Sequence, residues 1–421
     1  MTTFVPRNAE EVADTIRWAL AAREAFEVIA GGSKSSLGRP VDAPHRLDVS
    51  ALAGVVSYEP DELVLTARPG TPTEIVEALL AERAQCLAFE PPNLAPLLRG
   101  SASAHGDVAG DDGHMDARRG GTLGGVVSTG FSGPRRLRAG AVRDHLLGIA
   151  AVSGRGETFV GGGKVVKNVT GYDIPKLMTG SHGTLAVLTE ITLKVLPAPE
   201  DVRTLLVHGL AASDAVRVMT GVLQSDVDVS GACYFPADLA VPGTLSGDSR
   251  TALRLEGFLP SVEYRLVRLR EKLERQASLS VLDHATSLTF WRGVRDVRPF
   301  TDNASRMVWR LSVPPAEGAA VLERIAHAIP GTQSFLDWGG GLLWSQLPDD
   351  AGAHDSRART IRSAIGDAGG HAMLIRAPEH VRAGTDVFHP QAEGVAALSR
   401  RVKAQFDPSH LLNPGRMVAG V

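Results

Sequence analysis

The chain has 421 residues, of which 43% are hydrophobic and 22% charged, and its formal net charge is −3. This near-neutral balance excludes the strongly basic surface of a nucleic-acid-binding protein, and the length favours two domains over one core. Two cysteines, Cys86 and Cys233, are too few to ligate an iron–sulfur cluster or build a disulfide framework, which favours a reducing cytoplasm.

The N-terminus reads MTTFVPRNAEEV and has no basic flank leading into an apolar core, so no secretory signal is expected. No run approaches roughly 18 consecutive apolar residues, so we expect no transmembrane segment. We therefore expect a cytoplasmic protein, and peripheral attachment to a membrane through a partner stays open.

Residues 8–23 form the first predicted helix. Asn8 and Glu11 fit the N-cap and N3 positions of a capping box, and apolar residues then recur on one face. A strand over residues 26–30 is predicted to follow, and it leads directly into a glycine-rich loop.

This loop, GGSKS, is the first candidate phosphate site. Backbone N–H groups and small hydroxyls in a tight loop form a concavity that binds anions. It is neither a Rossmann fingerprint, since GxGxxG is absent, nor a Walker A motif, since Gly163-Lys164 is followed by Val165. The residues of the loop are Gly31, Gly32, Ser33, Lys34 and Ser35.

The next predicted elements are strands over residues 47–50 and 63–67 and a helix over residues 73–83. Thr71 or Thr73 is the expected N-cap of this helix.

Residues 93–119 form a polar, Gly- and Ala-rich insertion without apolar periodicity. Its acidic and histidine side chains resemble a set of metal ligands, but no rigid element fixes their geometry, so we expect a flexible insertion and no metal site. These side chains are His105, Asp107, Asp111, Asp112, His114 and Asp116.

Residues 120–197 carry glycines in short clusters between β-branched runs. Because glycine lets a backbone approach a ligand closely, the clusters indicate several turns that converge on one large ligand. We expect a glycine-lined turn over residues 122–130. The four arginines that follow it fit charge compensation near the ligand, a docking surface or a solvated basic loop; they are Arg135, Arg136, Arg138 and Arg143.

Strands over residues 149–152 and 158–160 are predicted to pair as a hairpin. Asp173 is well placed to cap a short helix over residues 174–178, and a strand over residues 191–196 closes the stretch.

Residues 197–200 read as a domain boundary, after which strands and helices alternate. The pattern of two βαβ-like halves predicts an antiparallel sheet backed by helices, as in a ferredoxin-like fold. The strands are expected over residues 202–207, 231–235, 252–257, 306–313, 333–337 and 341–346, and the helices over residues 212–223, 261–276 and 316–329.

Several motifs occur in a fixed order: TLGGVVSTG, GAVRDHLLG, KNVTGYDIPKL and GSHGTLAVLTEITLKVLP, with FDPSHLLNPGRM near the C-terminus. In this combination the chain resembles the vanillyl-alcohol-oxidase/PCMH superfamily of flavoproteins, and within it the E subunits of glycolate oxidase. The resemblance implies an α+β fold, with a two-subdomain PCMH-type FAD-binding domain over residues 1–199 and a ferredoxin-like cap over residues 200–380. Residues 381–421 are implied to return to the FAD-binding domain.

The resemblance also implies that the glycine-rich loops hold FAD. Some relatives bind flavin covalently through a histidine in the first loop, where this chain has Lys34 and Ser35, so we expect non-covalent FAD. The cofactor contacts implied beyond that first loop are Pro69, Thr122, Leu123, Gly124, Gly125, Ser128, Thr129, Gly130, Asp173, Gly180, Ser181, Gly183, Thr184 and Val187. His182 occupies a variable position and is not expected to be catalytic.

Oxidation of a 2-hydroxy acid needs a cation for the carboxylate and a base for the hydroxyl proton. The sequence leaves both unassigned. The candidate bases are His371 and His389, and the candidate cations are Arg254, Arg295, Arg298, Arg310 and Arg376.

Many related D-2-hydroxy-acid dehydrogenases carry a metal motif near GDGNxH, which this chain lacks. The resemblance therefore favours an FAD-binding subunit that acts on glycolate with a larger FAD-containing catalytic subunit and an iron–sulfur subunit, held peripherally at the inner membrane through these partners. An autonomous 2-hydroxy-acid dehydrogenase and a non-catalytic scaffold or binding protein are the alternatives.

Overall fold

The computed structural model of the chain describes residues 1–98, 121–163, 171–240, 247–349 and 354–420. Most of the predicted insertion, with His105 to Asp116, lies outside these ranges.

The chain begins with a three-stranded parallel sheet in the order β1-β3-β2. Its strands are β1 (Thr2–Phe4), β2 (Phe26–Ile29) and β3 (His45–Asp48). Helix α1 (Ala9–Ala22) connects the first two strands. The predicted cap is confirmed, because the side chain of Asn8 accepts a hydrogen bond from the N–H of Glu11.

A second sheet has five antiparallel strands in the order β4-β5-β9-β7-β8. The predicted hairpin is confirmed as β7 and β8. The strands are β4 (Val55–Glu59), β5 (Val64–Ala67), β7 (Leu146–Ser153), β8 (Thr158–Gly162) and β9 (Ala186–Lys194). A small ribbon pairs β6 (Gln85–Cys86) with β10 (Leu196–Pro197).

Short helices pack around this second sheet and its ribbon: α2 (Thr73–Ala81), α5 (Leu123–Thr129), α7 (Val142–His145) and α8 (Ile174–Met178). Helices α3 (Ala95–Leu98) and α6 (Arg136–Ala139) instead contact the sheet formed by the second half of the chain.

Two expectations about these helices are wrong. Pro72, which has no polar side-chain atom, is the N-cap of α2. The hydroxyls of the two expected caps bond elsewhere: that of Thr71 donates to the Arg68 carbonyl and that of Thr73 to the Gly121 carbonyl. Residues 122–130 form a capped helix rather than a turn. The expected cap of α8 is confirmed, since the Asp173 side chain accepts from the N–H of Lys176.

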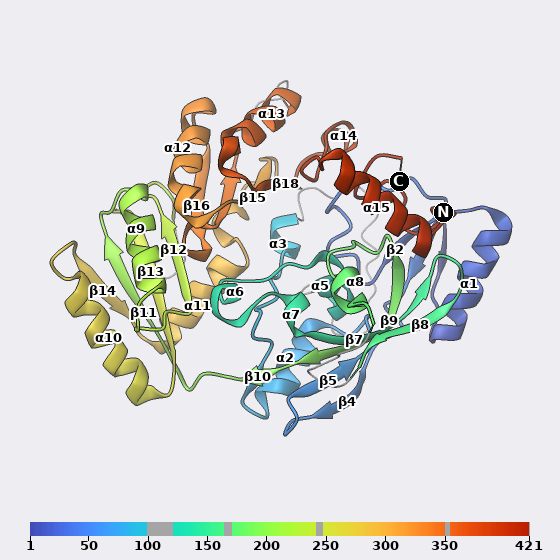
Figure 1. Ribbon diagram of the computed structural model, residues 1–421, viewed down its shortest axis with the longest axis horizontal. Helices are drawn as coiled ribbons and strands as arrows, with labels where there is room; N and C mark the ends of the chain where they lie inside the picture. The colour runs from blue at the N-terminus through green and yellow to red at the C-terminus, as the bar shows by residue number, and fades with distance from the viewer. Residues whose placement is uncertain (99–120, 164–170, 241–246, 350–353, 421) are drawn as a thin grey trace.

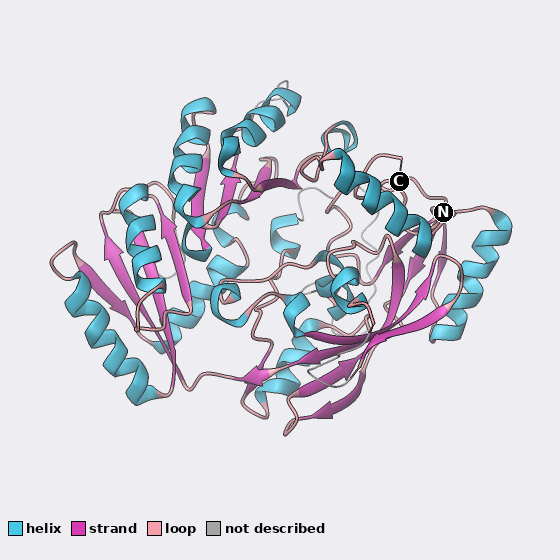
Figure 2. Cartoon of the chain, in the orientation of Figure 1, coloured by secondary structure: helices cyan, strands magenta, loops and turns pink. Residues whose placement is uncertain are grey.

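The second half of the chain forms an eight-stranded sheet in the order β14-β11-β13-β12-β16-β17-β15-β18, antiparallel throughout. Figure 2 shows it as a body of sheet separate from the first two. Its strands are β11 (Asp201–His208), β12 (Gly231–Phe235), β13 (Arg250–Gly257), β14 (Leu279–Leu282), β15 (Val308–Ser312), β16 (Gln333–Asp337), β17 (Leu342–Gln346) and β18 (His371–Arg376).

The two faces of this sheet have different coverings. Four helices bury one face in a continuous apolar core: α9 (Ala212–Leu223), α10 (Leu259–Leu273), α12 (Gly318–Ala328) and α13 (His354–Ile365). Helix α11 (His284–Arg295) and segments of the first half cover the other face, which faces the first half in Figure 1. The expected α+β class, with an antiparallel sheet backed by helices, is confirmed.

The chain ends on the first half again. After α14 (Glu379–Gly384) and α15 (Glu393–Phe406), Leu412 forms a parallel bridge with Phe26 at the start of β2. In Figure 1 both termini lie on the same side of the molecule, close to β2.

Candidate cofactor and substrate site

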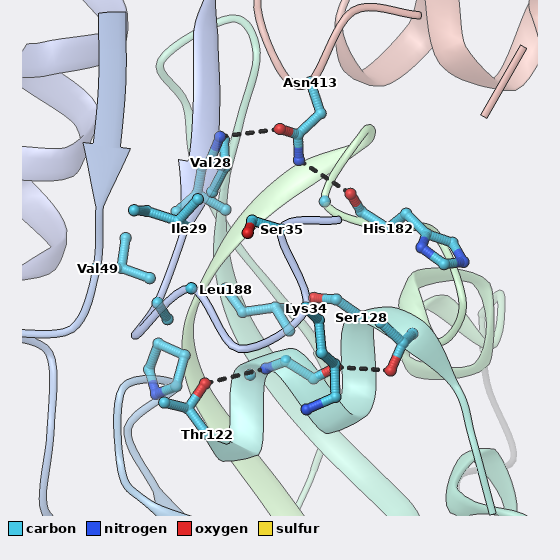
Figure 3. A pocket seen from close by; sticks show the side chains of 18 of the residues that line it. Val28, Ile29, Lys34, Ser35, Val49, Thr122, Ser128, His182, Leu188 and Asn413 are labelled. Atoms are coloured by element: carbon cyan, nitrogen blue, oxygen red, sulfur yellow. Dashed lines mark hydrogen bonds between the residues drawn. The ribbon is translucent and has the colours of Figure 1, made fainter. Parts of the chain in front are cut away.

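An open cavity of about 100 Å³ lies in the first half of the molecule, among β2, α5, β9 and the C-terminal segment. Figure 3 shows side chains from all four converging on it. Its apolar wall consists of Val28, Ile29, Ala30, Leu37, Val49, Ala186, Val187 and Leu188. A long apolar wall with a few polar groups at one end is typical of a cofactor site.

The polar end of the cavity is the loop that follows β2. Gly31 and Gly32 are both left-handed, with φ of 73° and 72°. Within the described part of the chain, the backbone N–H groups of Gly32, Ser33 and Lys34 have no hydrogen-bond acceptor. Successive unpaired N–H groups in such a turn form a nest that binds anions.

Lys34 adds a full positive charge to this nest. Its Nζ has no hydrogen bond or ion pair within the described residues, and Figure 3 shows it beside α5 without a partner. A Cβ atom on Gly121 would lie 2.6 Å from this Nζ, and the φ of Gly121, 92°, also favours glycine at this position. Burial lowers the pKa of Lys34 to about 8. An unpaired ammonium in such a place fits an anionic group of a ligand.

Helix α5 lines the cavity but does not offer N–H groups from its first turn. The N–H of Leu123 donates to the Thr71 carbonyl, that of Gly124 to the Pro69 carbonyl, and that of Gly125 to the Thr122 side chain. What α5 does present is the hydroxyl of Ser128, which makes no hydrogen bond within the described part of the chain.

Most of the residues that the sequence pointed to line this one cavity: Gly32, Ser33, Lys34, Ser35, Pro69, Thr122, Gly124, Gly125, Ser128, Thr129, Gly183 and Val187. Their contact with a cofactor stays a prediction.

The other predicted contacts do not line the cavity: Gly31, Leu123, Gly130, Asp173, Gly180, Ser181 and Thr184. They support it instead. Leu123 is in the apolar core, Gly130 caps α5 in a left-handed conformation, and Asp173 caps α8. The N–H of Gly180 donates to the Val127 carbonyl, and the Thr184 hydroxyl donates to the Ser181 carbonyl at 2.7 Å.

Sequence reasoning missed the contribution of the C-terminal segment to the lining. Asn413 and Arg416 both face the cavity. The FDPSHLLNPGRM motif was a signal for them, because its resemblance implied that residues 381–421 return to the FAD-binding domain. His182 also lines the cavity, and burial lowers its pKa to about 3, which keeps it neutral.

The structure separates the five candidate arginines by their partners. Arg254 donates to both oxygens of Glu90, and Arg295 pairs with Asp296. Arg376 donates to four backbone carbonyls, those of Arg306, Leu97, Phe300 and Asn303. Arg298 is exposed at the surface. None of these four therefore offers a buried guanidinium without a partner to a ligand.

Arg310 differs from the others, because within the described residues its guanidinium has no hydrogen bond or ion pair. Three aromatic rings surround it, with centroids 5.3 Å (Phe131), 5.1 Å (Trp338) and 6.0 Å (Trp344) from its Cζ. Burial, helped by the charge of Arg136, lowers the pKa of Arg310 to about 10, so it stays charged at neutral pH. Rings that cover the faces of a guanidinium leave its N–H edge free for a carboxylate.

Arg310 is not among the residues that line the cofactor cavity, but it contacts the segment that follows α5. Phe131, one of its three rings, directly follows the C-cap of α5. On the strand register, Arg310 of β15 lies opposite Met373 of β18, and Ser312 lies opposite His371. Because alternate residues share a face, His371 and Arg310 point to the same side of the sheet.

The two candidate histidines differ in the same way. His389 Nδ1 accepts a hydrogen bond from the N–H of Ala372, whereas the ring of His371 has no hydrogen bond within the described residues. Desolvation and the charges of Arg310, His389 and Arg136 lower the pKa of His371, so its ring is neutral at pH 7 and able to accept a proton.

The four arginines after α5 do not act as one group. Arg135 is half-buried and bonds Glu256 through two nitrogens, and Arg136 stacks on Trp338 at 4.3 Å. Arg138 pairs with Asp228, and Arg143 lies 3.8 Å from Asp144. Only the last two fit a solvated basic loop.

Across the described ranges, no cluster of three or more His, Cys, Asp and Glu side chains is arranged to hold a metal ion. None of the helices in those ranges combines the length and the apolar character needed to cross a bilayer.

Comparison with known proteins shows which family the chain belongs to. Residues 2–115 match the family model described as an FAD binding domain. Glycolate oxidase subunit GlcE of Escherichia coli (strain K12) is 32% identical over 411 residues, which are 98% of this chain and 97% of that protein. Glycolate oxidase subunit GlcD of Bacillus subtilis (strain 168) is 26% identical over 71% of this chain and 68% of its own.

Solved structures agree on the fold. 4-Ethylphenol oxidase from Gulosibacter chungangensis superposes with a TM-score of 0.71 at 14% identity, covering 99% of this chain and 88% of that one. An alkyldihydroxyacetonephosphate synthase gives 0.69 at 14% identity, covering 98% of this chain and 75% of that one. The family model confirms FAD as the expected cofactor, and the nest, the free Lys34 ammonium and the long apolar wall fit its pyrophosphate and its rings.

Proposed function

Because the chain belongs to the GlcE family of FAD-binding glycolate oxidase subunits, we propose that it is the FAD-binding subunit of a complex that oxidises glycolate to glyoxylate. It is an FAD-dependent oxidoreductase of the group that acts on hydroxy acids. The observation that carries the proposal is the cavity with the anion nest and the unpaired Lys34 at one end.

In this proposal the loop after β2 holds the FAD pyrophosphate without a covalent bond. The free N–H groups of Gly32, Ser33 and Lys34 and the Lys34 ammonium supply the donors, and the Ser128 hydroxyl lies nearby. When bound, FAD supplies the acceptor for two electrons from the carbon that carries the substrate hydroxyl. The predicted contacts that line the cavity are part of the same proposal, and the remaining ones are proposed to support its walls.

Arg310 is proposed as the residue that binds the substrate carboxylate. It is a charged guanidinium without a partner among the described residues, and aromatic rings hold it in place. His371 is proposed as the group that takes the hydroxyl proton, because it shares the sheet face with Arg310 and its ring is neutral. A fixed cation and a nearby base would orient a small 2-hydroxy acid and remove its proton.

The partners are proposed from the family alone: a larger FAD-containing catalytic subunit and an iron–sulfur subunit, with peripheral attachment to the inner membrane through them. Residues 1–199 are proposed as the FAD-binding domain, residues 200–380 as the cap and residues 381–421 as the returning segment.

A second candidate, an autonomous 2-hydroxy-acid dehydrogenase, is favoured by one observation. A subunit that only stored FAD would have no use for an unpaired cation such as Arg310 inside the molecule. The first candidate and this one differ in whether the isolated chain reduces its own flavin.

The experiment that separates them follows the visible spectrum of the purified chain, without oxygen, while glycolate is added. A flavin band that persists until the partner subunits are supplied supports the complex. A flavin band that bleaches in the isolated chain supports autonomous oxidation. A colourless chain that cannot be reconstituted with FAD would overturn both.

A further inference from the structure

We infer that the C-terminal clasp, residues 407–417, sets how tightly the protein holds FAD, and that Asn413 is the positioning residue through which it does so. The inference rests on the proposed FAD site in the cavity. It does not require Asn413 to bond the cofactor. The clasp acts by joining two walls of the cavity that are far apart in the sequence.

The side chain of Asn413 bridges these two walls. Its Oδ1 accepts a hydrogen bond of 2.9 Å from the N–H of Val28 on β2, and its Nδ2 donates one of 2.9 Å to the carbonyl of His182. Figure 3 shows both bonds across the upper end of the cavity. Val28 and His182 both line the cavity, and Asn413 itself is 2% exposed. One amide therefore fixes the distance between β2 and the loop before β9.

The side chain of Asn413 is closely packed. Asn413 has a left-handed backbone with φ of 46°, a conformation that asparagine tolerates better than most residues. A Cβ atom on Gly183, the next residue of the opposite loop, would lie 2.8 Å from Asn413 Nδ2. The glycine at this position thus allows the amide to reach His182.

The clasp is anchored by a buried ion pair. Lys403, on the last turn of α15, donates to Asp407 Oδ2 at 2.7 Å and to the carbonyls of Thr184 and Leu412. The Asp407 carboxylate also accepts the N–H groups of Leu411 and Leu412. Every donor of the Lys403 ammonium is used, so this pair has the complete bonding that makes a buried ion pair rigid.

A second anchor holds the phosphate loop itself. Arg416 Nη1 donates to the carbonyls of Ser35 and Leu37, and Nη2 pairs with Glu27 at 3.0 Å. The clasp thereby touches the loop after β2, the strand β2 and the loop before β9, which form three sides of the cavity. A cavity wall held from outside is pre-organised for its ligand, and loss of that order appears as weaker binding.

The test measures FAD binding to the full-length apo-protein by flavin fluorescence, for the wild type, Asn413→Ala and Asn413→Asp. Asn413→Ala loses both bridging bonds, so the Kd for FAD should rise about tenfold or more. Asn413→Asp keeps the acceptor for Val28 but sets a carboxylate oxygen against the His182 carbonyl. Its Kd should rise at neutral pH and fall back toward that of the wild type as the carboxyl is protonated and donates again.

The matched control is Gln346→Ala. Gln346 is a buried amide of the other half, 3% exposed, and it donates to the Phe300 carbonyl at 3.3 Å. Its removal should lower the melting temperature of the apo-protein but leave the Kd for FAD unchanged. If both Asn413 variants bind FAD within about twofold of the wild type, the inference is wrong while the FAD site stands. If Asn413→Ala does not fold, the pH profile of Asn413→Asp decides. A wild type that does not bind FAD overturns the proposed function and the inference together.

Discussion

Single charged side chains without a bonding partner are the groups of this site that can bind an anionic ligand. Lys34 and Arg310 are the clearest cases, since each keeps a positive charge inside the molecule without an ion pair in the described structure. Burying such a charge without a partner costs free energy, and binding of an anionic ligand offsets this cost. The anionic ligand of Lys34 is expected to be the pyrophosphate, and that of Arg310 the carboxylate of a substrate.

The Lys34 assignment predicts a pH dependence of FAD binding. Without FAD the pKa of Lys34 is about 8, and a bound pyrophosphate would raise it. FAD should therefore bind with full affinity below pH 8 and progressively more weakly as the pH rises above 8. Titration of apo-protein with FAD between pH 6 and about 9.5 checks this. Lys34→Met should bind FAD more weakly at pH 7 and lose the pH dependence; a wild-type affinity that stays flat across this range would refute the assignment.

The Arg310 assignment predicts a loss that is confined to the substrate. Arg310→Met should raise the substrate concentration needed for half-maximal flavin reduction by about 10- to 100-fold, because a charge-assisted hydrogen bond to a carboxylate is lost. The Kd for FAD should not change. Reduction is followed with glycolate and, as a second carboxylate substrate, lactate, in the complete complex if the isolated chain is inactive. The exposed Arg298→Met is the control, and an equal effect of both substitutions would exclude Arg310 as the carboxylate site.

At the scale of elements, helix α5 shows why the glycine-rich stretch over residues 122–130 is a helix although its sequence predicts a turn. TLGGVVSTG contains two adjacent glycines, which predict a turn, yet Thr122 caps the helix through Gly125 and Gly130 ends it in a left-handed conformation. Tertiary packing overrides the poor helix propensity of glycine here. A Cβ atom on Gly124 would lie 2.7 Å from the Pro69 Cβ, so the glycine is required for close approach and not for a turn.

This packing predicts that Gly124→Ala destabilises the first half of the chain. The added methyl group has no space against Pro69, whose carbonyl also accepts the Gly124 N–H, and overpacking of this kind costs about 1–3 kcal/mol. The free energy of unfolding, measured in urea, and the affinity for FAD should both decrease. Gly221→Ala is the matched control: Gly221 is inside helix α9, and a Cβ atom there would have no neighbour within 4 Å, so alanine should stabilise by about 0.5–1 kcal/mol. Equal behaviour of the two variants would contradict this account.

The sequence predicts elements well where one face is regularly apolar or a cap is explicit. Helix α9 and strands β12 and β16 have the predicted bounds, and the caps Asn8 and Asp173 are in place. The sequence also indicates which loops meet at the cavity, through the family motifs. It cannot rank the candidate arginines, because their difference lies in partners such as Glu90, which is more than 160 positions away from Arg254. Long-range pairing of this kind leaves no local pattern.

At the scale of the whole molecule, charged pairs join the two halves. Glu90, from the first half, accepts two hydrogen bonds from Arg254 on β13, and Arg135, also from the first half, bonds Glu256 on β13. Arg254 further stacks on Trp291 at 4.6 Å. These groups line a second cavity of about 110 Å³ between the halves. The pairs fix the position of the eight-stranded sheet, and with it Arg310, relative to the first half of the chain.

The ionisation of Glu90 should therefore control how firmly the halves are joined. Burial alone would raise the pKa of Glu90, but the charge of Arg254 and the hydrogen bonds from Arg254 and Arg135 outweigh it, so the pKa is lowered. A carboxyl with a lowered folded-state pKa contributes stability that is present above its unfolded value near 4.5 and is lost as the pH falls through the folded value. The wild type should accordingly lose stability below about pH 4.5 through this pair.

Glu90→Gln should remove this acid-labile stability at neutral pH. It removes the carboxylate that bonds Arg254, whose side chain is 3% exposed, and leaves only Glu256, 3.7 Å from the Arg254 Nε, as a counter-charge. Breaking a buried pair costs about 3–5 kcal/mol. Because glutamine retains one acceptor for Arg254, the lower end is expected. Urea unfolding at pH 7 and pH 4 measures this cost. The difference in the free energy of unfolding between the variant and the wild type should be smaller at pH 4 than at pH 7. The double change Glu90→Gln with Arg254→Met should recover most of the loss, since no buried charge is then unpaired. Asp226→Asn, which breaks the exposed pair with Arg268, should cost less than about 1 kcal/mol. If Glu90→Gln costs no more than that surface change, the two halves are held together by apolar packing alone.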